Sequence, residues 1–263
     1  MTDPGTAVQP ADGAAVRQLA ALLAGAERVF VLSGAGMSTE SGIDDFRGPN
    51  GLWTRNPAAA RMFDIDAYRS DREVRTAAWE HRARSPIRSA APNVGHRVLA
   101  RWQDDRAVTI ATQNIDGLHQ RAGSAEVLEL HGSFWQAQCL DCGEHSPIEA
   151  VFGRLDAGEE DPACLRCGGI LRTATVAFGQ ALDPAVLGGA VRAARASVVA
   201  LAIGTSLTVQ PAASLCGVAA ADGASVVIIN EQPTDYDSMA DLVIHAGIGA
   251  TLAAVDALLL NDS

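Results

Sequence analysis

Long apolar runs and basic charge are both scarce in this chain of 263 residues. No apolar stretch reaches the roughly 20 residues of a membrane-spanning helix, and residues 1–13 lack the basic and apolar parts of a secretion signal. We therefore expect a cytoplasmic protein with no membrane partner. The 20 basic residues are outnumbered by 31 acidic ones, which gives a net charge of −11. Such a surface repels nucleic acid and favours basic partners, such as lysine-rich protein segments.

Internal repeats and low-complexity tracts are also missing, and the regular features are short apolar runs. Runs typical of buried parallel strands occupy residues 28–32, 107–111, 126–130, 197–203 and 224–230. Stretches of helical pattern, such as residues 92–102 and 211–221, separate them. Alternating strands and helices predict an α/β fold with a doubly wound, Rossmann-like parallel sheet, whose ligands bind at the carboxyl ends of the strands.

Two segments interrupt this alternation and predict a second, smaller module. Residues 49–89 are rich in Arg, Asp and Pro with helical pieces, and residues 137–172 have little apolar content. We expect them to form a helical insertion and a zinc-binding insertion. The remaining segments, residues 14–48, 90–136 and 173–260, would form the Rossmann-like domain.

Four of the five cysteines form two CxxC pairs, Cys139 with Cys142 and Cys164 with Cys167. Each pair can hold one side of a tetrahedral zinc ion, and four thiolates leave no open position, so the zinc would be structural. A redox dithiol and a nucleic-acid-binding zinc ribbon are the alternatives. The fifth cysteine, Cys216, lies in an apolar helical stretch and is interpreted as a core residue.

A glycine turn, Gly34-Ala35-Gly36, follows the first predicted strand and is a candidate phosphate-binding loop. Thr39 stands where a dinucleotide-binding fingerprint has its third glycine, and no acidic residue closes a second strand about 20 residues later. An ordinary NAD dehydrogenase is therefore disfavoured, and a simple tight turn stays an alternative.

Polar residues follow the next two predicted strands. Gln113, Asn114 and Asp116 come after residues 107–111, and His131 comes after residues 126–130. These strand ends should face one crevice, where an imidazole with a pKa near the working pH is suited to general-base catalysis. His119, in the next predicted helix, is interpreted as structural.

Four segments together resemble the signatures of the sirtuin family, in the same order along the chain. They are residues 33–48 (SGAGMSTESGIDDFRG), 112–119 (TQNIDGLH), 131–132 (HG) and 204–211 (GTSLTVQP). The similarity covers about residues 28–252 and is of the bacterial type, with some likeness to the mitochondrial-type branch in residues 79–96.

The resemblance implies an NAD-dependent protein-lysine deacylase that consumes NAD as co-substrate and releases nicotinamide and O-acyl-ADP-ribose. Its partners would be acyl-lysine proteins. The residues that would bind NAD are Gly34, Ala35, Gly36, Asp45, Phe46, Arg47, Gln113, Asn114, Ile115, Asp116, Gly204, Thr205, Ser206, Asn230, Glu231, Gln232 and Ile248.

The resemblance also implies the roles at the reacting centre. Asn114 and His131 would be catalytic, with His131 taking a proton from a ribose hydroxyl. Val176, Phe178 and Gly179 would bind the acyl-lysine, whose backbone would pair with residues 176–179 as an added strand. A mono-ADP-ribosyltransferase or NAD hydrolase with the same site is the enzymatic alternative, and an NAD-sensing module without turnover is the non-enzymatic one.

Some residues depart from the family pattern. Asp44 and Thr173 each stand where proline is common, and Gln180 replaces a glutamate. At the positions of the tyrosine and arginine of lysine desuccinylases the chain has Trp79 and Arg82. We interpret Trp79 as packed and Arg82 as solvated, which predicts no strong preference for acidic acyl groups.

Overall fold

Six parallel strands form the main sheet of the computed structural model, which describes residues 11–45, 48 and 51–261. From one edge to the other, the strands are β3 (Val127–Glu129), β2 (Ala107–Thr112), β1 (Arg28–Ser33), β7 (Val199–Ile203), β8 (Ser225–Ile229) and β9 (Leu242–Ile244). Within the sheet this is the order 3-2-1-4-5-6 of a Rossmann fold, so the predicted fold class is confirmed. All five predicted strands are present, and β9 is one that the sequence did not predict.

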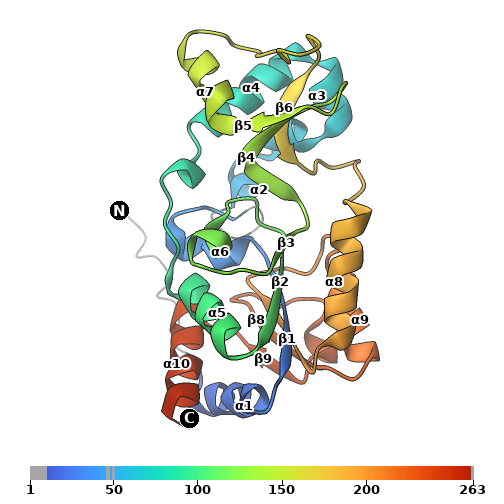
Figure 1. Cartoon of the computed structure of the whole chain (residues 1–263). Coiled ribbons are helices and arrows are strands. Elements are labelled where there is room, and N and C mark those ends of the chain that lie inside the picture. Colours follow the sequence, from blue (N-terminus) through green and yellow to red (C-terminus); the bar gives the residue numbers. More distant parts are fainter. Residues whose placement is uncertain (1–10, 46–47, 49–50, 262–263) are drawn as a thin grey trace, which may run out of the picture.

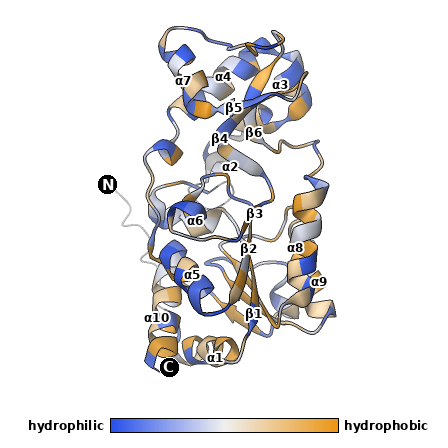
Figure 2. Ribbon diagram, in the orientation of Figure 1, coloured by the Kyte–Doolittle hydropathy of each residue, from blue (hydrophilic) through white to orange (hydrophobic). Residues whose placement is uncertain are grey.

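Both faces of the sheet are covered by helices because its central strands are apolar on both sides. In β1, Val29 and Val31 belong to one core cluster, whereas Phe30 and Leu32 belong to the other. Figure 1 shows α1 (Gly13–Ala24), α5 (Val94–Asp105) and α10 (Ile248–Asn261) on the first face, and α8 (Pro184–Ala196) and α9 (Ser214–Ala221) on the second. The hydropathy colouring of Figure 2 shows the apolar strands enclosed between these helices. Cys216 of α9 is buried there, as predicted.

A three-stranded antiparallel sheet forms a second core at the opposite end of the molecule (Figure 1). Its strand order is β5 (His145–Pro147), β4 (Gly132–Cys139) and β6 (Leu171–Thr175). Around it lie α2 (Leu52–Arg55), α3 (Ile65–Ser70), α4 (Arg72–Ala83) and α7 (Ile148–Asp156). The small sheet extends beyond residues 137–172 on both sides, and the division of the chain into two domains stays a prediction.

Short helical turns lie between these elements. They are η1 (Ala35–Ser41), η2 (Pro57–Phe63), η3 (Pro86–Arg88), α6 (Leu118–Arg121) and η4 (Asp237–Met239). None of the helices in residues 11–45 and 51–261 combines the length and apolarity that crossing a bilayer requires.

Arginine supplies every basic side chain other than histidine, because all 20 Lys and Arg positions of the sequence are Arg. Arg75 of α4 donates to both oxygens of Asp161, after α7, and so links two parts of the small module. Arg101 of α5 pairs with Asp256 of α10, which also accepts a 2.9 Å hydrogen bond from the Trp102 indole. The first pair is largely buried and ties together segments 86 residues apart.

Candidate active site

The strand order of the main sheet reverses between β1 and β7, and predicted NAD-binding residues lie at the carboxyl ends of these two strands. Here the backbone of the glycine turn touches the loop after β7: the Gly36 amide donates to the Gly204 carbonyl at 2.8 Å. A Cβ on Gly36 would lie 2.9 Å from the Gly204 Cα, and one on Gly204 would lie 2.3 Å from the Met37 nitrogen. Gly204 also has a φ of +62°, which favours glycine. These glycines therefore let the loops after β1 and β7 meet, and this packing role was not predicted from the sequence.

A buried polar cluster follows β2. The Asn114 amide donates to the Gly34 carbonyl at 2.9 Å and to the Ser38 hydroxyl at 3.1 Å. Ser38 in turn donates to Asp116 at 2.7 Å, and the other oxygen of Asp116 accepts from the Leu118 amide. Burial raises the pKa of Asp116, while these two hydrogen bonds oppose the shift. The cluster holds the end of β2 against the glycine turn.

His131 lies beside Gln113, the first residue after β2. Its Nδ1 lies 2.9 Å from the Gln113 carbonyl oxygen, which can only accept. The proton of the neutral ring therefore sits on Nδ1, and Nε2 keeps a lone pair, the state that a general base needs. Burial lowers the pKa of His131, and the hydrogen bond to Gln113 partly offsets this. The Gln113 side chain donates to the Thr205 hydroxyl at 3.0 Å and so joins the ends of β2 and β7.

The other predicted cofactor residues surround the same strand ends, with differing burial. Ile248, at the start of α10, is buried and lies where a Cβ on Gly204 would meet its Cδ1 at 2.9 Å. Asn230, Glu231 and Gln232 follow β8, where the Asn230 amide donates to the Gln232 carbonyl. Five of these residues are partly buried, namely Ala35, Asp45, Ile115, Ser206 and Asn230, whereas Glu231 and Gln232 are exposed. Asp45 accepts from the Gly48 amide, whereas Phe46 and Arg47 lie outside the described residues.

Ser38 and Trp135 also organise this cluster, and the sequence analysis did not select them. Ser38 bridges Asn114 and Asp116, and the Trp135 indole donates to the Asp116 carbonyl at 2.7 Å. Ser38 lies within the segment 33–48 that resembles a sirtuin signature, and this motif could have identified it. Trp135 contacts a residue 19 positions away, and nothing local marks it.

The four predicted zinc ligands come together. The sulfur atoms of Cys139, Cys142, Cys164 and Cys167 all lie within 4.8 Å of one another, with 3.6 Å between Cys139 and Cys167 and 3.8 Å between Cys142 and Cys164. A tetrahedron with zinc–sulfur bonds of about 2.3 Å has edges of about 3.8 Å, so the cluster fits zinc.

The two metal-binding turns share one backbone geometry. The Gly143 amide donates to the Cys139 carbonyl and the Gly168 amide to the Cys164 carbonyl, and both glycines have a positive φ. Because all four positions are thiols and the cluster is far from the carboxyl ends of β1 and β7, zinc there would stabilise the small module without activating water.

The expected acyl-lysine segment is not a free strand edge. β6 ends at Thr175, and the Phe178 amide already donates to the Phe63 carbonyl at 2.8 Å while its carbonyl accepts from the Ile65 amide. The Val176 amide donates to the carbonyl of His131 at 2.8 Å, which ties this segment to the candidate base. Phe178 and Gly179 are exposed, and Val176 is half-buried.

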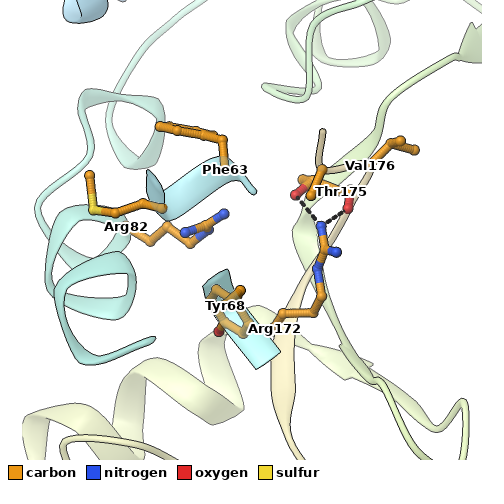
Figure 3. Close-up of a pocket in the computed structure, with 8 residues that line it drawn as sticks. Phe63, Tyr68, Arg82, Arg172, Thr175 and Val176 are labelled. Atoms are coloured by element: carbon orange, nitrogen blue, oxygen red, sulfur yellow. Dashed lines mark hydrogen bonds between the residues drawn. The ribbon is translucent and has the colours of Figure 1, made fainter. Parts of the chain in front are cut away.

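A narrow pocket beside Val176 corrects the interpretation of Arg82. Arg82 is buried rather than solvated, and its Nε donates to the Thr173 hydroxyl at 2.7 Å. Figure 3 shows Arg82 and Arg172 on opposite sides of the pocket, with Arg172 directed toward Thr175 and Tyr68 below the gap between them. Trp79 is buried, as predicted.

The two guanidinium groups of this pocket lack an acidic partner. Arg172 donates to the Gln180 side chain and the Thr175 carbonyl, and no carboxylate of a described residue pairs with either arginine. Burial lowers the pKa of Arg82, and burial with the nearby Arg82 charge lowers the pKa of Arg172 to about 10. The same burial raises the pKa of Tyr68 to about 12.

Similarity to known proteins defines the class. Residues 34–211 match the Sir2 family. The chain is 48% identical over 236 residues to the NAD-dependent protein deacetylase 2 of Streptomyces coelicolor, covering 89% of this chain and 98% of the relative. It is 40% identical over 249 residues to an NAD-dependent protein deacylase of Ralstonia nicotianae, covering 93% and 97%.

A solved structure agrees with the sequence relatives. A Sir2 protein in complex with deacetylated p53 peptide and 3′-O-acetyl ADP-ribose superposes with a TM-score of 0.85 at 32% identity, covering 91% of this chain and 96% of that one. The chain therefore belongs to the Sir2 family of sirtuins. It is an NAD-dependent protein deacetylase or deacylase, with NAD as co-substrate and a four-cysteine cluster consistent with structural zinc.

Proposed function

We propose that NAD binds at the carboxyl ends of β1 and β7 and that the acyl-lysine of a protein enters beside Val176. NAD supplies the electrophilic ribose carbon and loses nicotinamide. The glycine turn and residues 204–206 would face its phosphates, and Ile248 with residues 230–232 would face its adenosine. This assignment is supported by the meeting of these residues at the switch point of the sheet, the usual ligand position of a Rossmann fold.

His131 is the general base of this proposal, and its tautomer is the observation that supports the assignment. The Gln113 carbonyl holds the proton on Nδ1, which leaves Nε2 free to take a proton from a ribose hydroxyl. Asn114, held by Gly34 and Ser38, would orient the ribose, and Asp116 would keep Ser38 in place. Hydrogen bonds within the protein fix the orientation of both side chains.

Product analysis distinguishes this function from its enzymatic alternative. With NAD and an acetyl-lysine peptide, we expect one O-acetyl-ADP-ribose for each nicotinamide released. Nicotinamide release with free ADP-ribose, or with ADP-ribosylated protein, and no change in the peptide would refute deacylation. A protein that binds NAD without releasing nicotinamide would instead be the sensing module.

The partners of the enzyme would be acyl-lysine segments of proteins, not nucleic acids or membranes. A net charge of −11 attracts the basic sequences in which lysines are common and repels phosphate-rich polymers. We place the enzyme in the cytoplasm, because a four-thiolate zinc cluster requires reduced cysteines.

A preference for acyl groups that carry a carboxylate is a second candidate, supported by the pocket of Arg82 and Arg172. Two buried cations without a counterion are unfavourable, and a carboxylate between them would compensate both charges. Gln180, which stands where the family pattern has glutamate, contributes a neutral amide to Arg172. Val176 lines this pocket and is also the residue beside which the acyl-lysine is proposed to enter. An acyl chain that extends past Val176 would therefore reach the arginines.

Matched peptides test this preference. The same peptide carrying succinyl-lysine or the neutral butyryl-lysine, which has a chain of the same length, is compared by kcat/KM. We expect the succinyl peptide to be favoured, and Arg82→Met to reduce its kcat/KM by about tenfold or more, the worth of a charged hydrogen bond, while the butyryl value changes little. Arg69→Met, which removes an exposed arginine of α3, is the control. Equal kcat/KM values for both acyl groups would exclude this second candidate and leave deacylation intact.

A further inference from the structure

Two buried histidines lie behind the active site, and neither belongs to the proposed chemistry. His96 of α5 has no exposed surface and His119 of α6 is 1% exposed. Their rings are arranged edge to face with centroids 4.8 Å apart. Each ring has one buried nitrogen without a partner among the described residues, Nε2 of His96 and Nδ1 of His119.

The tautomer of His96 follows from its position at the start of α5. The backbone amide of Asn93 points at its Nδ1 at 3.3 Å, completing a capping box in which the Asn93 side chain accepts from the His96 amide. An amide can only donate, so Nδ1 accepts. A neutral imidazole then carries its proton on Nε2, the unpartnered nitrogen.

The tautomer of His119 follows from the opposite end of the pair. Its Nε2 lies 2.9 Å from the Ser33 hydroxyl, and Ser33 gives its own proton to Thr112 at 2.8 Å. Ser33 therefore accepts from His119, whose proton is on Nε2, and Nδ1 is left as an acceptor. The unpartnered donor of His96 and the unpartnered acceptor of His119 are thus complementary on adjacent rings.

We infer that His96 and His119 form a tautomer-locked positioning pair, in which one buried water accepts a hydrogen bond from His96 Nε2–H and donates one to His119 Nδ1. The resulting chain of hydrogen bonds runs in one direction from Asn93 through both rings to Ser33 and Thr112. A buried donor and acceptor are each unfavourable when unpaired, and this single link satisfies both.

Hydrogen bonds at both ends of this chain fix residues of the proposed NAD site. The Thr112 hydroxyl accepts from the Asn114 amide at 3.1 Å, so one end of the chain fixes the backbone of the residue proposed to orient the ribose. At the other end, the Asn93 side chain donates to the Met37 carbonyl of η1 at 2.8 Å, which fixes the glycine turn. This inference rests on the proposed NAD site, whereas the tautomers do not.

Nitrogen-15 NMR of the histidine rings at pH 7 tests the tautomers independently of activity. For His96 and for His119 we expect a neutral ring that carries its proton on Nε2 and accepts at Nδ1. The signals of the two rings are assigned with the variants His96→Gln and His119→Gln. A protonated Nδ1 on either ring, or an imidazolium, would overturn the inference whatever the enzyme does with NAD.

Two substitutions at His119 then test the positioning. Gln places an amide near the position of Nε2 and can still donate to Ser33, whereas Asn is too short. We expect His119→Asn to raise the KM for NAD by about tenfold, the value of one hydrogen bond, with the peptide KM unchanged and with His119→Gln near wild type. Leu19→Ala, in the core contact of α1, is the control for a general loss of stability. Equal KM values for NAD in both His119 variants would overturn the positioning role.

Discussion

Acid should unfold this protein by protonating the unfolded chain at two histidines that stay neutral in the fold. Burial, with the facing His119 and Arg97 charges, lowers the pKa of His96 from 6.5 to about 3, and burial lowers the pKa of His119 from 6.5 to about 4. Below pH 6.5 the unfolded chain therefore binds two protons that the folded chain does not. The stability from these rings is fully present above pH 6.5 and is lost as the pH falls towards 4.

The magnitude follows from the number of protons. Each contributes about 1.4 kcal/mol per pH unit, so the free energy of unfolding should fall by nearly 3 kcal/mol per pH unit below pH 6 and by about 5 kcal/mol at pH 4.5. A typical domain has about 5–15 kcal/mol in total. Burial raises the pKa values of Asp116 and Glu129, which has the opposite sign and offsets part of the loss at the acidic end.

Urea unfolding at pH 7, 6 and 5 measures this slope. The double variant His96→Gln, His119→Gln should lose the larger part of the pH dependence, and each single variant about half of that part. Burial also lowers the pKa of His131 and of His81, which leaves a remainder of the same sign. Zinc release at low pH affects all four proteins alike, and the zinc content is measured in the same samples. An unchanged slope in the double variant would refute the reasoning, because the protons would then bind elsewhere.

Three further outcomes follow from the site and the cysteine cluster. His131→Ala should lower kcat by about 10²–10⁴-fold without changing the zinc content or melting temperature, and the exposed His145→Ala should be neutral; retained activity would contradict the base assignment. Cys142→Ser should reduce bound zinc from one per chain and unfold the small module, whereas Cys216→Ala should keep it, as metal analysis and circular dichroism can show. Gly36→Ala should lower stability by about 1–3 kcal/mol and raise the KM for NAD, because its Cβ meets the Gly204 backbone. Gly25→Ala, with nothing within 4 Å, is its control in urea unfolding.

The sequence predicted the main sheet because its strands are continuous apolar runs, which burial on both faces requires. It did not predict β9, a strand of three residues at the sheet edge, two of which are only partly buried. Nor did it predict the small sheet, since β4 mixes polar and apolar residues without a clear alternation. Short or mixed strands depend on their partners, which a local pattern does not reveal.

The candidate site was likewise predicted only in part. The cysteine spacing and the strand-end polar residues predicted which side chains would meet, because a parallel sheet brings its strand ends to one edge. Arg82 was predicted wrongly, because a charged residue on a polar helix normally faces solvent, and its partner Thr173 is 91 residues away. The packing of Gly36 against Gly204 was likewise invisible, because it depends on a contact between two distant loops.

Because all 20 Lys and Arg positions are arginine, the protein itself offers no lysine side chain for acylation. The enzyme acts on lysine, and these 263 residues contain none. Reactive acyl donors that modify lysine side chains have no such target in this sequence, and no lysine here competes for the active site. The guanidinium groups that link α4 to α7 and α5 to α10 keep their charge under the same exposure. The sequence of this enzyme therefore contains no lysine side chain that could become a substrate of its own reaction.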